Sequence, residues 1–325
     1  MVPRIRIILF AIPVLVAGSL VAAGGDQGPQ TPTKAVQLTG LTGVKDNTKG
    51  SLTIETGTLR FRHSSMTSDV VATSMQDVVT GDDSQRMIGG TLGTLSQLGP
   101  YGSGRFLSLF RSKIDTLSIK YRDMNEGLHG AIFTMPVGTA ETIKEKLVAA
   151  GAHTTVPAPA SPTANTAGPS DADLGSHPQE GGSAKLNASA IEIMMIQSDE
   201  IKLPAEFQIS LYENLVQQMQ KNGGFAHVYR DGERDSVDAP NLVILHSTVR
   251  GFKKGSEMAR QVTTVAGATS ITIHCAFTDK DGRLLLARDI KGKVRFFGGN
   301  LRATYDFAKK AAKVTRENIS RPAGA

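Results

Sequence analysis

The chain has 325 residues, with 36 Lys and Arg, 30 Asp and Glu, one Cys and no Trp. Hydrophobic residues at 40% and charged residues at 20% are ordinary globular values, which argues against wholesale disorder and against a protein with many membrane spans. The single Cys excludes an intramolecular disulfide and a zinc or iron–sulfur site built from cysteines. The length favours about two domains.

The first segment has the pattern of an export signal. Arg4 and Arg6 precede an apolar run over 7–23 that ends in Val21-Ala22-Ala23. A basic start, a short apolar core and small residues at the exit predict a secretory signal peptide over 1–23. The alternative is an uncleaved anchor in the inner membrane. We therefore expect an exported protein, periplasmic or extracellular, that is soluble after cleavage.

Two segments carry the composition of flexible chain. Pro, Ala, Ser, Thr and Gly dominate residues 152–188, without apolar periodicity. Such a segment buries too little surface to offset its ordering entropy, so we expect a disordered linker there. Residues 24–48 are interpreted as a flexible leader. Two folded blocks remain, at 49–151 and 189–320.

The first block is predicted to be β-rich. Alternating runs predict strands at 51–56 and 58–62 and one or two strands within 69–79. A hairpin joins 115–121 to 128–133, and a helix follows over 139–150. A strand meander closed by one C-terminal helix resembles the pleckstrin-homology-like (PH-like) fold. The resemblance lies in the order of elements, over about 100 residues, and includes no diagnostic motif.

A Gly- and Leu-rich segment interrupts this block at 87–105. It lacks the Gly-Lys-Ser/Thr of a phosphate loop, and Gly102-Ser-Gly104 lacks the third Gly of a dinucleotide fingerprint. Its role stays open between an insertion that packs on its own sheet, an anion-binding loop, a membrane-dipping segment and an oligomerisation surface.

The second block has clearer patterning. We expect strands at 190–196, 225–229 and 242–250, a helix over 203–221, a hairpin of 268–278 with 283–287 that continues towards 296, and a last helix over 301–319. Phe207, Leu211, Leu215 and Met219 form an i+4 apolar stripe on the first helix. The resulting β-α-β-β-β-β-α order predicts an α+β sandwich.

Three runs of this block resemble the bacterial envelope family called domain of unknown function 4410. They are the helix opening Leu203-Pro-Ala-Glu-Phe207, the run 265–273 (VAGATSITI) and the hairpin 278–286 (TDKDGRLLL). The resemblance covers about 130 residues and implies a fold and an envelope location but no chemistry. Members are often lipoproteins. No lipid-accepting Cys stands directly after the apolar run of the export signal, so membrane tethering is not carried over.

No catalytic residue, metal site or cofactor site is predicted. There is no Gly-x-Ser-x-Gly and no His-Glu-x-x-His. His246, His274 and Cys275 lie on neighbouring predicted strands, but His274 and Cys275 point to opposite faces, so at most one joins His246. The carboxylates at 231–238 are interpreted as a solvated loop and those at 279–281 as turn residues.

The positive charge is concentrated at the C-terminal end, where residues 279–316 hold 11 Lys and Arg against four Asp and Glu. The candidate anion-binding surface consists of Lys291, Lys293, Arg295, Arg302, Lys309, Lys310 and Lys313. Such a surface suits acidic envelope polymers or anionic lipid headgroups. Nucleic acid is not expected, because the compartment is wrong and no base-stacking platform of aromatic residues is visible.

These observations favour a non-enzymatic exported protein of the bacterial envelope that binds a protein or polymer partner. Peripheral association with anionic lipid is the alternative, and a hydrolase with a dispersed active site is the least favoured hypothesis. The sequence leaves the partner's identity and the oligomeric state open.

Overall fold

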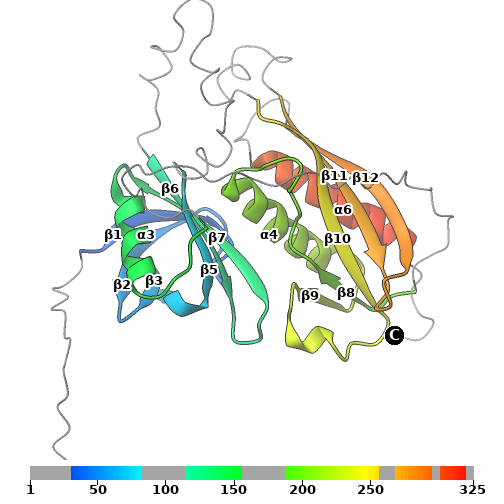
Figure 1. Cartoon of the computed structure of the whole chain (residues 1–325), viewed down its shortest axis with the longest axis horizontal. Coiled ribbons are helices and arrows are strands. Elements are labelled where there is room, and N and C mark those ends of the chain that lie inside the picture. Colours follow the sequence, from blue (N-terminus) through cyan, green and yellow to red (C-terminus); the bar gives the residue numbers. More distant parts are fainter. Residues whose placement is uncertain (1–30, 82–113, 156–186, 256–267, 295–300, 320–325) are drawn as a thin grey trace, which may run out of the picture. The chain divides into compact units, whose positions relative to one another are not determined.

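The computed structural model describes residues 31–81, 114–155, 187–255, 268–294 and 301–319. The predicted signal peptide, most of the linker, the Gly- and Leu-rich segment and Arg295 lie outside these residues. Within them the fold is a mixed α+β architecture made mostly of strands, with two sheets and three α-helices (Figure 1).

The first sheet is fully antiparallel, and its strands lie in the order β4-β3-β2-β1-β7-β6-β5. The strands are β1 (Thr33–Thr39), β2 (Thr48–Glu55), β3 (Thr58–His63), β4 (Met66–Val71), β5 (Met75–Thr80), β6 (Ile114–Arg122) and β7 (Leu128–Pro136). Helix α3 (Thr139–Ala149) follows β7 and packs Ile143 and Leu147 into the core of this sheet. The predicted strands, hairpin and helix of the first block are present.

Strand β1 corrects the expected flexible leader over 24–48. Its residues Thr33–Thr39 pair with β2 on one side and β7 on the other, so the strand lies in the middle of the sheet. The apolar signal is weak because Gln37 and Thr39 take inward positions, and Gln37 is completely buried. Alternation of apolar and polar residues, the usual indication of a strand, therefore fails here.

The second sheet has the order β12-β11-β10-β8-β9. Its strands are β8 (Ala190–Ile193), β9 (His227–Arg230), β10 (Leu242–Lys253), β11 (Thr269–Thr278) and β12 (Leu284–Val294), with helices α4 (Ala205–Asn222) and α6 (Arg302–Asn318). Strand β8 pairs in parallel with β9 and β10, and the other pairs are antiparallel. The chain order of these elements is β-α-β-β-β-β-α, as predicted.

The apolar stripe of α4 faces the second sheet. Phe207, Leu211, Leu215 and Met219 are all buried in one cluster with the inward residues of β8, β10 and β11. Helix α6 adds Phe307 and three alanines to the same cluster, so α4 and α6 share one face of the sheet, side by side (Figure 1). The hairpin between β11 and β12 turns at Asp279–Gly282, where Gly282 has a φ of 79° and Asp279 accepts the amides of Asp281 and Arg283.

Helix α4 also contacts the first sheet, on the side opposite its apolar stripe. Ile209 lies against Gly130 of β7, so closely that a Cβ at Gly130 would stand 2.6 Å from Ile209 Cγ2. A Cβ at residue 130 would force a shift of this contact, since real Cβ atoms do not approach so closely. The described residues of both sheets belong to one compact unit.

Candidate functional site

The basic residues of α6 form a stripe on its exposed side. Arg302, Lys309, Lys313 and Arg316 are all exposed, while Phe307, Ala308, Ala311 and Ala312 are buried on the other side. Their spacings of seven, four and three residues place the four cations along one line of the helix. Tyr305 lies within this stripe and is 45% exposed. We call these five residues the α6 basic stripe.

The other predicted basic residues have a different environment. Lys310 donates to the carbonyl of Lys291 at 2.9 Å and forms an ion pair with Asp306 at 2.7 Å. Asp306 also accepts the amide of Lys293 at 2.8 Å. Lys310 and Asp306 therefore satisfy backbone groups on the open edge of β12, a common way to protect an edge strand from further pairing.

The predicted anion-binding surface is thus divided. Arg302, Lys309 and Lys313 lie in the stripe. Lys310 bonds instead to the edge strand β12. On that strand Lys291 is exposed and Lys293 is half-buried. Arg316 belongs to the stripe but was absent from the predicted set. Arg316 follows Lys309 by seven residues, which is two turns of a helix, and this spacing in the sequence could have identified it.

The His and Cys candidates on the second sheet do not converge. Cys275 is fully buried opposite Ser247, and burial raises the pKa of its thiol to about 12. His274 lies on the other face and bonds to Asp289 across the β11–β12 pair, with 2.6 Å between Nδ1 and Oδ1. His246 pairs with Ala276 in the register. Among the residues that the structure describes, no three His, Cys, Asp or Glu side chains could hold a metal ion together.

Part of the acidic loop at 231–238 forms an internal contact, while Asp235 and Asp238 are exposed, as its interpretation as a solvated loop expects. Asp231 accepts the amide of Leu128 at 3.1 Å through its carbonyl, and the Arg122 side chain at 2.8 Å through the same oxygen. Asn125 donates to Asp235 at 3.0 Å, and its carbonyl accepts the amide of Arg234. The tip of the β6–β7 hairpin is therefore bonded to this loop.

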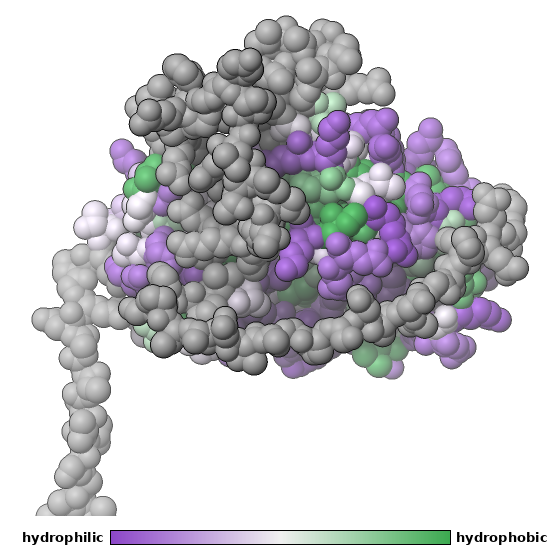
Figure 2. All heavy atoms as spheres, turned by 45° about the horizontal axis from the view of Figure 1, so that its top comes forward, coloured by the Kyte–Doolittle hydropathy of each residue, from purple (hydrophilic) through white to green (hydrophobic). Residues whose placement is uncertain are grey.

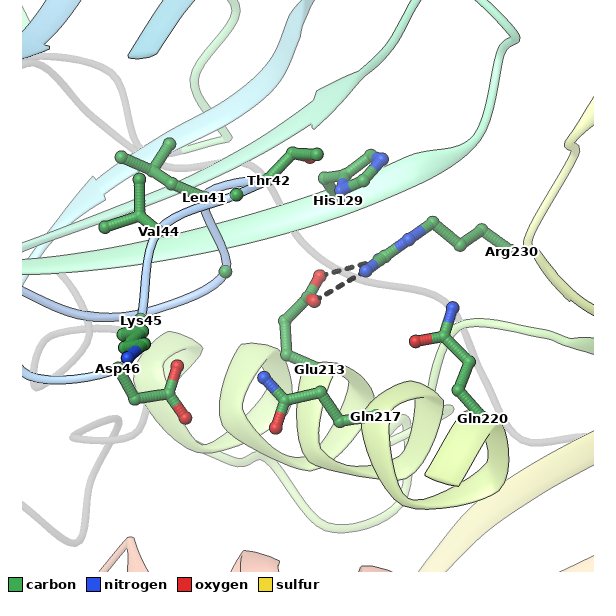
Figure 3. A pocket seen from close by; sticks show the side chains of 12 residues that line it. Leu41, Thr42, Val44, Lys45, Asp46, His129, Glu213, Gln217, Gln220 and Arg230 are labelled. Carbon is green, nitrogen blue, oxygen red and sulfur yellow. Dashed lines mark hydrogen bonds and ion pairs between the residues drawn. The ribbon is translucent and has the colours of Figure 1, made fainter. Parts of the chain in front are cut away.

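A polar pocket of about 560 Å³ lies beside this contact (Figure 3). One wall is the loop Gly40–Asp46 that follows β1, the second is His129 on β7, and the third consists of Glu213, Gln217 and Gln220 on α4. Arg230, at the end of β9, completes it. The sequence did not predict this pocket, because its lining residues come from four separate stretches of the chain.

Glu213 and Arg230 fix the inner end of the pocket. Arg230 donates from Nη1 to Oε1 and from Nη2 to Oε2, both at 2.9 Å, and Nη1 also reaches the carbonyl of Leu128 at 2.9 Å. Glu213 Oε1 accepts the amide of Gly130 at 2.8 Å. Burial disfavours the charge on Arg230, but the adjacent Glu213 carboxylate outweighs it and raises the pKa of the guanidinium.

His129 lies at the pocket wall with its ring against Tyr121, at 5.2 Å between centroids. Its Nε2 is 3.0 Å from Oδ2 of Asp123. Burial, aided by the charge of Arg230, lowers the pKa of His129. Burial also raises the pKa of Tyr121 to about 12. Both rings are therefore neutral at pH 7.

The described surface is mostly polar on the face drawn in Figure 2, where hydrophilic side chains surround a small hydrophobic area. Within the described ranges, no helix is both long and apolar enough to span a bilayer.

Comparisons with known proteins give only distant structural similarities. No protein-family model matches the sequence, and no curated protein matches it. The PelC dodecamer from Paraburkholderia phytofirmans matches with a TM-score of 0.31 at 9% identity, over 44% of this chain and 96% of that chain. A point variant of the PelC dodecamer from the same organism matches with a TM-score of 0.30 at 11% identity, over 42% and 93%. The crystal structure of an uncharacterized protein matches with a TM-score of 0.23 at 14% identity, over 41% and 95%.

Proposed function

We propose that this chain is a non-enzymatic, exported binding protein of the bacterial envelope that takes an acidic polymer or protein partner on the α6 basic stripe. The observation that carries the proposal is the alignment of Arg302, Lys309, Lys313 and Arg316 on the exposed side of one helix. A single-sign row of exposed cations attracts polyanions and accelerates their encounter. The export signal and the resemblance to domain of unknown function 4410 support the envelope location.

The proposal extends to architecture. Residues 49–151 would form a PH-like module, here extended by β1, and 189–320 a module of the domain of unknown function 4410 type, with 152–188 as the linker. The β-α-β-β-β-β-α order of the second half and its Asp279–Gly282 hairpin support this assignment.

Binding of poly-L-glutamate tests the proposal. The variant Lys309→Gln/Lys313→Gln/Arg316→Gln removes three exposed charges and should weaken binding by roughly tenfold or more, with a smaller dependence on salt. The matched control Lys34→Gln/Lys49→Gln/Lys202→Gln removes three exposed lysines from other elements. Equal losses in both variants would show that only net charge matters and would contradict the proposal.

Tyr305 favours a second candidate function, peripheral association with anionic lipid. An aromatic ring among cations on an amphipathic helix suits a membrane interface, where each basic residue contributes about 1 kcal/mol near anionic lipid. Sedimentation with phosphatidylglycerol vesicles would then lose roughly 100-fold in affinity in the triple α6 variant, and Tyr305→Ser would weaken binding further. Equal binding to phosphatidylcholine vesicles would contradict this function.

A further inference from the structure

His129, which lines the pocket, has a buried ring nitrogen that no described residue bonds. Burial opposes the charge on Asp123, but its bonds to His129 and to the amides of Gly127 and Asn125 outweigh this effect and lower its pKa. Asp123 is therefore a carboxylate, so Nε2 of the neutral His129 ring carries the proton and donates it. Nδ1 is then an acceptor. It is buried and has no hydrogen-bond partner among the described residues.

Two carboxylates supply further acceptors at the same pocket. Glu213 Oε2 accepts from Arg230, which leaves this oxygen a second lone pair. Asp46 lies on the opposite loop, with Gln217 beside it (Figure 3). Desolvation, together with the negative charge of Glu213, raises the pKa of Asp46 and outweighs the hydrogen bonds from Thr39 and Gln217, which lower it. A positive group between Asp46 and Glu213 would relieve this repulsion.

The acceptors select the chemical class of the ligand. An ammonium group carries three donors and no acceptor, which matches His129 Nδ1, Glu213 and Asp46. A carboxylate or phosphate would instead meet the negative charges of Asp46 and Glu213. Two cations, the exposed Lys45 and Arg230, also line the pocket. The repulsion between Arg230 and a bound cation is reduced, because two hydrogen bonds pair the guanidinium with the Glu213 carboxylate. Leu41 and Val44 line the same pocket and offer an apolar wall to an alkyl stem.

We propose that this pocket binds a primary ammonium group on a short alkyl stem, either as a free aliphatic amine or as a lysine side chain of a partner. The ammonium group donates to His129 Nδ1, Glu213 and Asp46, and the stem packs on Leu41 and Val44. This site is separate from the α6 basic stripe, which attracts charges of the opposite sign.

Titration of the full-length protein with four small molecules, followed by NMR of the Gly130 amide and the His129 ring, tests this site. The probes are n-butylammonium, N-acetyl-lysine amide, n-butanol and butyrate. We expect saturable shifts with one or both ammonium probes and weaker binding of butanol and butyrate. Binding of n-butylammonium alone would identify a free amine, and binding of N-acetyl-lysine amide alone a lysine of a partner.

The variant Asp46→Asn should weaken ammonium binding by about tenfold, because a charge-assisted hydrogen bond is lost. Asp199→Asn, which changes another exposed carboxylate elsewhere, should leave it unchanged. Butyrate binding as tightly as n-butylammonium, no binding of either ammonium probe, or an unaffected Asp46→Asn variant would overturn the proposal. These measurements do not depend on poly-L-glutamate binding, so the proposal for the pocket and the proposal for the α6 basic stripe can be overturned separately.

Discussion

Glu213 of α4 and Arg230 at the end of β9 form a two-bond ion pair, and both partners also bond to β7, through the amide of Gly130 and the carbonyl of Leu128. Only 3% of the Glu213 side chain and 15% of the Arg230 side chain are exposed. This pair therefore joins the second block to the first at the pocket.

Removal of one partner should destabilise the whole chain. Glu213→Gln or Arg230→Gln leaves a buried group without its charge partner, and each should lower the free energy of unfolding by about 3–5 kcal/mol. The double variant should lose clearly less than the sum of the two. Urea denaturation of all four proteins measures this coupling. Strict additivity would show that the two side chains stabilise the fold independently.

Gly130→Ala should loosen the contact between α4 and β7. The new Cβ would lie 2.6 Å from Ile209 Cγ2, and overpacking of this kind costs about 1–3 kcal/mol. Adding Ile209→Ala, which removes the obstructing atoms, should recover part of this loss. At Gly81 the nearest atom would be 3.5 Å from a new Cβ, so Gly81→Ala serves as the control in the same thermal melts. A larger loss for Gly81→Ala would contradict the packing argument.

The free energy of unfolding should decrease as the pH drops below about 6.5, and protonation of His129 should account for part of this decrease. Its pKa is lowered in the folded state, so the unfolded chain binds a proton first. Its contribution is therefore complete above the unfolded pKa and is lost as the pH falls through the folded pKa. Denaturation midpoints between about pH 7 and 5 measure the slope.

The variant His129→Gln should flatten this slope, while the exposed His227→Gln should keep it. An unchanged slope in His129→Gln would assign the pH dependence to other groups.

Asp306→Ala should open the edge of β12. The amide of Lys293 would lose its acceptor and Lys310 its ion-pair partner, at a cost of about 1 kcal/mol. An uncapped edge can pair with a second chain, so light scattering should detect association that increases with concentration. The control Lys313→Ala changes a nearby exposed residue and should show the same light scattering as the unmodified protein. If Asp306→Ala keeps the molecular mass of the unmodified protein at all concentrations, Asp306 is not needed to protect the edge of β12.

The sequence predicted those elements whose local pattern agrees with their environment. The stripe from Phe207 to Met219 lies in the core, and Asp279 and Gly282 make the expected turn. The sequence did not predict strand β1, because the buried Gln37 breaks the alternation of apolar and polar residues. On α4, Glu213 has the position expected of a solvent-facing residue, yet it is buried because a second sheet covers that side. The pocket was beyond prediction, since it depends on how β7, α4 and β9 meet.

The bonds between the β6–β7 hairpin and the loop after β9 have a consequence for the folding of the chain. Arg122 and the carbonyl of Asp231 are separated by 109 residues. During synthesis the first sheet can therefore form early, but the hairpin tip, including the Leu128 amide, lacks these partners until the second block has emerged. Closure of such distant contacts is entropically slow. We expect docking of the hairpin to be a late event, after which the two blocks unfold as one cooperative body.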